Sequence, residues 1–371
     1  MADGRPAQGQ GTTLLIFLLK LSGGAGRNAV LYANILAGAG HRVTLVCGTT
    51  QGQGLEEGLD PAVTFRCMRA PRSLRSILPL AGVLRRTSPS HALVIGPTNM
   101  AGFRAAAVLA GFRGDVLWRI SNSPLGLLAS YPRWERALKK PVLAWDLRNA
   151  SRLIALNSAM ATELRTVWRV PDDRITLIPN GVALPEGTDG RPEPKDPPVI
   201  LCVGRLQPQK DHDTLLRAFA LLAKRRRCRL RLAGDGPLWS DLEALATRLG
   251  IADRVEFLGH VSDTGALYRQ ARVTVLSSRF EGFGLVLIEA LAHGCPVVST
   301  DCPSGPADVI DSPEVGFLAR VGDPEDLAEK IEAALDRHFD PTRLLSRAEH
   351  FSLDRLHQRV SALFLEKCVF Q

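Results

Sequence analysis

The stretch EGFGLVLIEALAHGCPVVST at 281–300 decides how the rest of the chain is interpreted. Residues 285–292 are apolar enough for a buried helix, and Gly294 is placed to end that helix. Just upstream, VTVLSS at 273–278 has the composition of a short buried strand, so 279–284 form a loop. This succession of strand, loop, helix and strand predicts a parallel α/β sheet.

Two carboxylates lie within the stretch. Glu281 lies in the loop, and Glu289 lies just over one turn inside the expected helix. Both can reach a ligand that lies across the helix N-terminus, where the free N–H groups of about 283–285 favour anionic oxygens. A glutamate within LVLIEALA is costly unless it is paired, which favours a binding role. The alternative is a buried glutamate satisfied by the backbone.

A second candidate segment is GRLQPQKD at 204–211, which follows the expected strand PVILCV. Arg205 and Lys210 are five residues apart across a loop, so an Arg fork and a Lys point charge can be aimed at one diphosphate. The alternative is two solvated loop cations. The position at the carboxyl edge of a sheet favours the functional interpretation.

A third candidate is the glycine turn SGGAG at 22–26, between the first expected strand and the first expected helix. Gly23 and Gly24 let backbone N–H groups approach an anion at the helix N-terminus. The segment lacks the Lys-Ser/Thr of a P-loop and is not GxGxxG, so an ordinary glycine turn stays open as the alternative.

The strand–helix alternation occurs twice, which fits the 371 residues and two domains. It stops in a proline-rich segment and then starts again. We expect a disordered leader at 1–11, a first Rossmann-like domain at 12–182, a linker at 183–198, a second Rossmann-like domain at 199–350 and a final amphipathic helix at 351–371.

The net charge of +8 is unevenly shared. Residues 1–190 hold 22 Lys and Arg against 12 Asp and Glu, a charge of +10, and 191–371 have a charge of −2. A basic half attracts anionic partners, so three interpretations stay open: ordinary solvated faces, an anionic membrane or lipid phosphate, and nucleic acid. The apolar and basic segment SLRSILPLAGVLRR at 73–86 favours lipid, because it has no aromatic residue for base stacking. Pro79 interrupts this segment, so we do not assign it to one continuous amphipathic helix.

Cysteines and apolar runs predict the class and location of the protein. The seven cysteines are scattered and never form a CxxC pair, so we expect buried free thiols and no metal site. The longest apolar run, 14–19, is far shorter than the roughly 20 residues of a membrane span and lacks the flanks of a signal peptide. We therefore expect a cytoplasmic protein, with peripheral attachment to the cytoplasmic membrane face as a further possibility.

A family resemblance is evident in several of these segments. GRLQPQKD, AGDGP at 233–237, the EGFG stretch with DCPSGPADVI behind it, and IPNGV at 178–182 strongly resemble the retaining glycosyltransferase family 4. The resemblance covers nearly all of 170–335 and is weaker over 12–169. It implies a GT-B fold, in which two Rossmann-like domains with parallel sheets face each other across a cleft. The resemblance further implies that 12–182 is the acceptor domain, that 199–350 is the nucleotide-sugar donor domain, and that the helix at 351–371 crosses back to the first domain.

The resemblance also implies roles for individual residues. Arg205 and Lys210 would neutralise the donor diphosphate, and Glu281, with the backbone of 283–285, would hold the sugar. Glu289 would accept hydrogen bonds from the ribose hydroxyls. Arg205, Lys210 and Glu281 are thus the expected catalytic residues. The expected donor-binding residues are Gly23, Gly24, Gly204, Arg205, Lys210, Gly282, Phe283, Gly284, Leu285 and Glu289.

One departure from the family concerns the acceptor side. Members often have a histidine after the strand that corresponds to HALVIGP, whereas this chain has GPTNMAG there. Asn99 or Asn122 is the candidate for the sugar or acceptor contact. No DxD motif stands out, and two cations with a helix N-terminus can stabilise a diphosphate without a metal, so no cofactor is expected.

The predicted function is that of a retaining, metal-independent glycosyltransferase. It would move a sugar from a nucleotide-diphospho-sugar to a glycan or lipid-linked acceptor in cell-surface polysaccharide biosynthesis. The base stays open among uridine, guanosine and adenosine. The alternatives are a GT-B epimerase or phosphorylase and a non-catalytic GT-B binding protein. A nucleic-acid partner is not expected, because the second half is slightly acidic.

Overall fold

Two parallel β-sheets organise the chain in the computed structural model, which describes residues 11–50, 54–96, 99–129, 131–185, 196–303 and 305–365. The expected leader, up to residue 10, and the middle of the expected linker, 186–195, lie outside the described residues. The chain divides into two units, which are described separately. Unit 1 comprises Met1–Leu156, Met160–Ile178 and His357–Gln371, and unit 2 comprises Asn157–Ala159 and Pro179–Leu356.

The sheet of unit 1 has seven strands in the order β3-β2-β1-β4-β5-β6-β7, and every neighbouring pair is parallel. The central strands are continuous apolar runs because helices cover both of their faces. The strands are β1 (Thr13–Lys20), β2 (Arg42–Thr49), β3 (Thr64–Cys67), β4 (His91–Ile95), β5 (Asp115–Arg119), β6 (Arg152–Ala155) and β7 (Ile175–Leu177).

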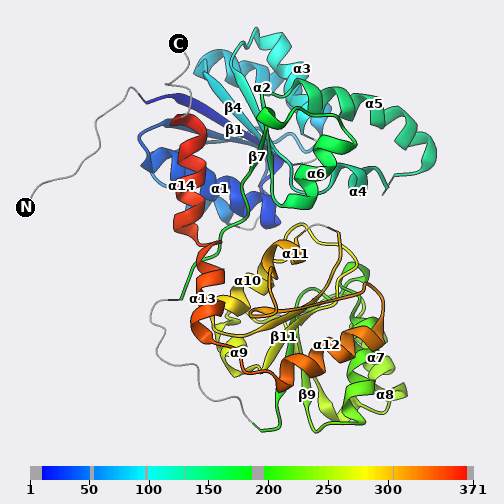
Figure 1. The fold of residues 1–371 in the computed structure, drawn as a ribbon. Helices are drawn as coiled ribbons and strands as arrows, with labels where there is room; N and C mark the ends of the chain where they lie inside the picture. Colours follow the sequence, from blue (N-terminus) through cyan, green and yellow to red (C-terminus); the bar gives the residue numbers. More distant parts are fainter. Residues whose placement is uncertain are drawn as a thin grey trace, which may run out of the picture. The chain divides into compact units, whose positions relative to one another are not determined.

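Helices flank this sheet, with α1 on one face and α2 and α3 packed together on the other (Figure 1). Farther along the chain, α4 and α5 extend beside α3. The helices are α1 (Gly23–Gly38), α2 (Ser73–Thr87), α3 (Met100–Ala110), α4 (Pro124–Ala129), α5 (Arg133–Asn149) and α6 (Ser158–Thr166), with 3₁₀ turns η1 (Leu55–Gly58) and η2 (Asp172–Arg174).

Helix α2 contains the segment that the sequence left unassigned, and it continues through Pro79 as one helix. Pro79 lacks the N–H that would bond to the carbonyl of Arg75. Both residues are exposed, so water can satisfy that carbonyl. The opposite face, which includes Leu80, Val83 and Leu84, is buried and holds the helix against the sheet.

The sheet of unit 2 has six strands in the order β10-β9-β8-β11-β12-β13, again all parallel. Numbered from the first strand of each unit, both sheets contain the order 3-2-1-4-5-6 of a doubly wound Rossmann sheet, and β7 adds a seventh strand at the edge of the unit 1 sheet. The predicted α/β class with two Rossmann-like sheets is confirmed. The strands are β8 (Val199–Val203), β9 (Arg229–Ala233), β10 (Val255–Gly259), β11 (Val273–Leu276), β12 (Val297–Thr300) and β13 (Gly316–Ala319).

In unit 2, α7, α8 and α12 cover one face of the sheet, and α9, α10 and α13 lie on the other (Figure 1). The helices are α7 (His212–Ala223), α8 (Trp239–Arg248), α9 (Gly265–Gln270), α10 (Leu285–Ala292), α11 (Pro306–Val309), α12 (Pro324–Asp336), α13 (Pro341–Glu349) and α14 (Leu353–Leu365), with 3₁₀ turns η3 (Pro208–Lys210) and η4 (Ala252–Arg254).

Helix α12 shows how local chemistry produces these elements. The carboxylate of Asp323 accepts a hydrogen bond from the Asp326 N–H at the helix start, and Pro324 takes the first helical position. The residues at helical spacing, Leu327, Ile331 and their neighbours, are buried against β11, β12 and β13. The helix therefore covers β11, β12 and β13 on one face of the unit 2 sheet.

Helix α14 places the last described residues with unit 1. The ring of Phe364 lies 5.8 Å from that of His41 and 5.6 Å from that of His91. Leu356 and Val360, one turn apart, are both buried. The residues from His357 onward thus contribute to unit 1, although they lie far from it in sequence.

One expectation about the cysteines is wrong. Cys67 is exposed because β3 is the edge strand of its sheet. Cys47, Cys202, Cys228 and Cys295 are buried free thiols, as is Cys302, whereas Cys368 lies outside the described residues. Within the described ranges, no helix has the length and apolar character needed to cross a membrane.

Candidate active site

The site residues predicted in unit 2 follow two adjacent strands. Gly204, Arg205 and Lys210 follow β8, and Glu281 lies in the loop after β11, the neighbour of β8. The strand order reverses between β8 and β11. In open α/β sheets, ligands bind at this reversal, beyond the carboxyl ends of the strands. The topology therefore brings the two candidate segments together at one sheet edge.

Lys210 and Glu281 form an ion pair at this edge. The Nζ of Lys210 lies 2.6 Å from Oε1 of Glu281, with side chains 19% and 7% exposed. Ser278 donates a second hydrogen bond to the same oxygen. Since both charges are largely removed from water, loss of one partner would leave a costly buried charge. The pair fixes the direction of the Lys210 ammonium, which has three donors and can still reach a phosphate oxygen.

Further contacts join the two loops. The hydroxyl of Ser277 donates to the Lys210 carbonyl over 2.8 Å, and the amide of Gln209 donates to the Phe280 carbonyl over 2.9 Å. Arg279 forms an ion pair with the buried carboxylate of Asp211 at 3.0 Å. These contacts make the loops one preorganised surface, which is what electrostatic stabilisation of a developing charge requires.

The glycines of the AGDGP segment allow a third loop to pack against this surface. A Cβ at Gly234 would lie 1.9 Å from the Gly204 carbonyl oxygen, and one at Gly236 would lie 2.4 Å from that of Leu206. The Leu206 N–H donates to the Asp235 carbonyl over 2.9 Å. Only glycine fits at these two close approaches, so the segment supports the loop that holds Arg205 and Lys210.

The start of α10 is shaped by Gly284, whose φ of 78° lies in the left-handed region. Phe283 is buried, and its ring packs edge-on against Phe351 at 5.5 Å. Phe283 therefore offers a ligand its backbone but not its side chain. The first turn of α10, from Leu285, contains no acidic residue that would oppose an anion.

Glu289 is held by a residue that the sequence analysis missed. The hydroxyl of the buried Tyr268 on α9 donates to Oε2 of Glu289 over 2.8 Å. Burial and the Glu289 charge raise the pKa of Tyr268 far above its ordinary value, so it stays a donor at any physiological pH. The contact fixes the carboxylate of Glu289 one turn inside α10. A tyrosine in GALYRQ, 21 residues before its partner, gives no local signal of this role.

Arg205 differs from Lys210 in its surroundings. Its side chain is exposed, and none of the described residues forms an ion pair with it. A guanidinium on a loop with no fixed partner can turn toward an anionic ligand. Of the two predicted cations on the loop after β8, Lys210 is thus held by an ion pair and Arg205 is exposed.

His212 is a second residue that the sequence analysis missed. It begins α7 directly behind this loop and is 1% exposed. Burial and the adjacent Lys210 charge lower its pKa to about 4. The imidazole is therefore neutral at pH 7, and it adds no positive charge that would repel Lys210.

The residues predicted in unit 1 follow the carboxyl ends of β1, β4 and β5. Gly23 begins α1 with a φ of 57°, and the space beside it and Gly24 is open. Asn99 is buried, and its amide donates to the Ile95 carbonyl. Asn122 is exposed. The donor, sugar and acceptor roles of these four residues stay predictions.

Metal ligands can be examined directly in the described part of the chain. No group of three or more His, Cys, Asp or Glu side chains there is arranged to hold a metal ion. The charges that converge at the unit 2 sheet edge are those of Lys210, Glu281 and the start of α10.

The sequence of the chain matches the models of two protein families. The model for glycosyl transferases group 1 matches residues 188–350, and that for Glycosyltransferase Family 4 matches residues 22–185. Together the two matches span most of the chain. The chain belongs to the family 4 type of GT-B glycosyltransferases.

The curated relatives of this chain include several glycosyltransferases. D-inositol 3-phosphate glycosyltransferase 2 of Catenulispora acidiphila is 38% identical over 221 residues, which are 54% of this chain and 51% of the relative. The lipopolysaccharide core biosynthesis glycosyltransferase LpsE of Rhizobium meliloti is 38% identical over 154 residues, 42% of this chain and 44% of the relative. The chain spans about half the length of the curated relatives that it matches.

Solved structures support the fold. Anabaena Alr3699/HepE in complex with UDP superposes with a TM-score of 0.77 over 96% of this chain and 100% of that one, at 19% identity. At this identity the similarity establishes the GT-B fold alone. The GT-B prediction is confirmed.

Proposed function

We propose that this glycosyltransferase uses a nucleotide-diphospho-sugar donor, acts with retention and needs no metal ion. The observation that supports this most is the convergence of Lys210, Glu281 and the start of α10 at the switch point of the unit 2 sheet. In this proposal the diphosphate lies against Lys210 and Arg205, and Glu289 holds the ribose.

The transfer step that we propose proceeds with retention. The bond between the sugar C1 and the distal phosphate oxygen breaks, and an acceptor hydroxyl oxygen bonds to C1 on the same face. The proton of that hydroxyl passes to the departing diphosphate, which leaves as a nucleoside diphosphate. Lys210 and Arg205 stabilise the charge that develops on the leaving group, which is the task a metal ion performs in other enzymes. Glu281 orients Lys210 and, with the 283–285 backbone, holds the sugar.

The donor that we favour is a UDP-sugar, and the acceptor is a glycan or a lipid-linked saccharide. The similar structure HepE is a complex with UDP, and the relative LpsE is named for lipopolysaccharide core biosynthesis. The basic charge of residues 1–190 suits an acceptor that bears phosphate.

The donor can be tested by thermal unfolding with UDP, GDP, ADP and their sugar conjugates in EDTA. A ligand at a hundredfold excess over its Kd stabilises the native state by about 2.7 kcal/mol, which shows as a clear rise in Tm. We expect a rise with uridine nucleotides alone. A rise that needs Mg²⁺ would contradict metal independence, and no rise with any nucleotide would favour the non-catalytic alternative.

The stereochemistry can be tested without knowing the acceptor. Slow hydrolysis of an α-linked donor should release the α-anomer first, as seen by ¹H NMR before mutarotation. First release of the β-anomer would overturn retention. Conversion of the donor into its epimer without loss of the nucleotide would favour the epimerase.

A further inference from the structure

Helix α5 exposes a continuous apolar stripe. Trp134, Leu138, Val142 and Trp145 recur at spacings of four, four and three residues, so they lie along one face of the helix. Their exposed fractions are 67%, 67%, 52% and 53%. Large apolar side chains scattered singly are ordinary on a surface, but four in line on one helix mark an interaction site.

The stripe is held in place and does not belong to a frayed helix. The guanidinium of Arg136 donates to the Leu128 and Ala129 carbonyls at the end of α4, both at 3.2 Å. The guanidinium of Arg104 stacks over the Trp145 ring at 3.5 Å and pairs with Asp146. The helix is thus anchored to α3 and α4 while its apolar face stays in solvent.

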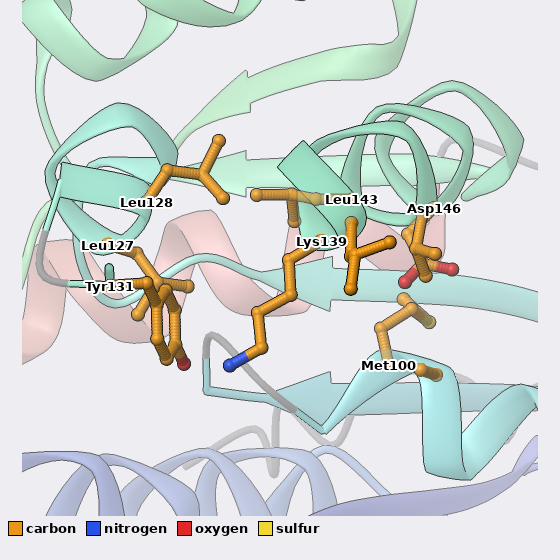
Figure 2. Close-up of a pocket in the computed structure, with 10 residues that line it drawn as sticks. Met100, Leu127, Leu128, Tyr131, Lys139, Leu143 and Asp146 are labelled. Atoms are coloured by element: carbon orange, nitrogen blue, oxygen red, sulfur yellow. The ribbon is translucent and has the colours of Figure 1, made fainter. Parts of the chain in front are cut away.

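Apolar surface continues from the stripe on both sides. Between α4 and α5 lies a hollow of about 430 Å³ with mainly apolar walls, including Leu127, Leu128 and Val142. Figure 2 shows Lys139 extending across this hollow toward Tyr131, whose ring it contacts at 3.4 Å. A second hollow, lined by Ile77 of α2, Val108 of α3 and Val142, joins α5 to the neighbouring helices.

Exposed apolar residues extend across α2 and α3. Leu74 and Leu78, one turn apart on α2, are 83% and 75% exposed, and Val108 on α3 is 75% exposed. We call the surface of α2 to α5 that includes these residues and the stripe the apolar-basic face.

The helices that carry this face are rich in basic residues. Helices α2 to α5 contain nine Lys and Arg and two acidic residues. Both acidic residues are already paired, Glu135 with Lys139 and Asp146 with Arg104. Apolar side chains flanked by cations, with tryptophan at each end of the stripe, suit the boundary between anionic headgroups and acyl chains.

We propose that the apolar-basic face docks on an anionic lipid bilayer, with the α5 stripe inserted at the headgroup level. Positive charge draws the face to the surface, and Trp134 and Leu138 supply the apolar contact that retains it. This inference rests on the proposed function only in explaining why a lipid-linked acceptor would be met there. The docking itself needs no donor.

The test is cosedimentation of the full chain with vesicles of equal parts phosphatidylglycerol and phosphatidylcholine. We expect binding at low salt, at least tenfold weaker binding to pure phosphatidylcholine, and loss of binding as salt rises. Trp134→Ser with Leu138→Ser should weaken binding at least fivefold. The matched control, Val167→Ser with Val321→Ser, removes two apolar residues that are exposed elsewhere, at 45% and 41%, and should bind as wild type does.

Several outcomes would overturn the inference. These are no binding to anionic vesicles, equal binding by the stripe variant, binding that single-stranded RNA competes away, or a dimer that the stripe variant dissolves. A cooperative thermal unfolding transition at the wild-type Tm, measured on the same samples without nucleotide, shows that each variant is folded. Nucleotide-induced stabilisation separates the two proposals, because stabilisation without vesicle binding refutes the docking alone, and vesicle binding without stabilisation refutes the donor site alone.

Discussion

The two sheets of the chain have the same strand order, yet the loops at their switch points differ. In unit 2 the loops after β8 and β11 hold the Lys210–Glu281 ion pair and are joined by hydrogen bonds. In unit 1 the corresponding segments after β1 and β4 contain glycines and the buried Asn99. The switch point of unit 2 thus carries a fixed ion pair, whereas that of unit 1 offers a ligand mainly the backbone at its glycines. The topology fixes where a ligand binds, and the loop residues decide which one.

The largest expected effect tests the charged loops of unit 2. Lys210→Ala should lower kcat by about 100- to 1,000-fold, because it removes a cation aimed at the leaving group and leaves the Glu281 carboxylate buried and unpaired. Steady-state transfer or donor hydrolysis measures it. Lys224→Ala, an exposed lysine at the end of α7, is the matched control and should keep wild-type turnover. Equal turnover in the two variants would remove Lys210 from the site.

A smaller effect is expected at Glu289. Glu289→Ala should weaken nucleoside diphosphate binding by about 10- to 100-fold through loss of the ribose hydrogen bonds, with a smaller effect on kcat. Calorimetric titration measures the affinity. Asn122→Ala in unit 1 is the comparison and should stay within about twofold of wild type. If Asn122→Ala weakened nucleotide binding more than Glu289→Ala did, the assignment of the donor to unit 2 would be wrong.

A positioning role for Tyr268 predicts a smaller change still. Tyr268→Phe keeps the buried ring but removes the hydroxyl that fixes Glu289, so nucleoside diphosphate affinity should fall about fivefold, roughly 1 kcal/mol. In a Glu289→Ala background the same substitution should change affinity by less than about twofold, because its partner is gone. Full additivity of the two changes would show that Tyr268 acts only through stability.

The smallest effect concerns stability and pH. The pKa of His212 is about 4 in the folded chain and about 6.5 when unfolded, so the unfolded chain binds more protons between these values. This contribution, up to about 3 kcal/mol, is complete above pH 6.5 and is lost as the pH falls toward 4. His212→Leu should therefore flatten the rise of the unfolding free energy between pH 4 and 6.5, as measured by urea unfolding. An unchanged slope would mean that folding does not lower the pKa of His212.

Much of unit 2 could be predicted from the sequence because its signals are local. The loop at 204–211 and the stretch at 281–292 each combine a strand end, a turn and charged residues within a dozen positions. The partner of Glu289 could not be predicted, because Tyr268 reaches it only through the packing of α9 against α10. A contact of this kind depends on tertiary structure and leaves no spacing pattern.

Helix α5 of unit 1 could not be predicted for a different reason, because its sequence pattern is not that of a buried helix. Helix α5 is absent from the sequence-based prediction because Pro132 and Pro141 interrupt its pattern and its first half buries no apolar face. The stripe from Trp134 to Trp145 does have helical spacing, but an exposed stripe does not look like a core helix. Pro79 likewise left the α2 segment without an assignment to one helix, although the hydrogen bond that this proline removes is dispensable at an exposed position.

The central claim is that Lys210 binds the distal phosphate of the donor without a metal ion. It is tested most directly by calorimetric titration of UDP and UMP, in EDTA, into wild type, Lys210→Ala and Lys224→Ala. The account predicts that Lys210→Ala weakens UDP binding at least tenfold but changes UMP binding by less than about twofold, and that Lys224→Ala changes neither. Equal weakening of UDP and UMP binding, or none, would contradict it.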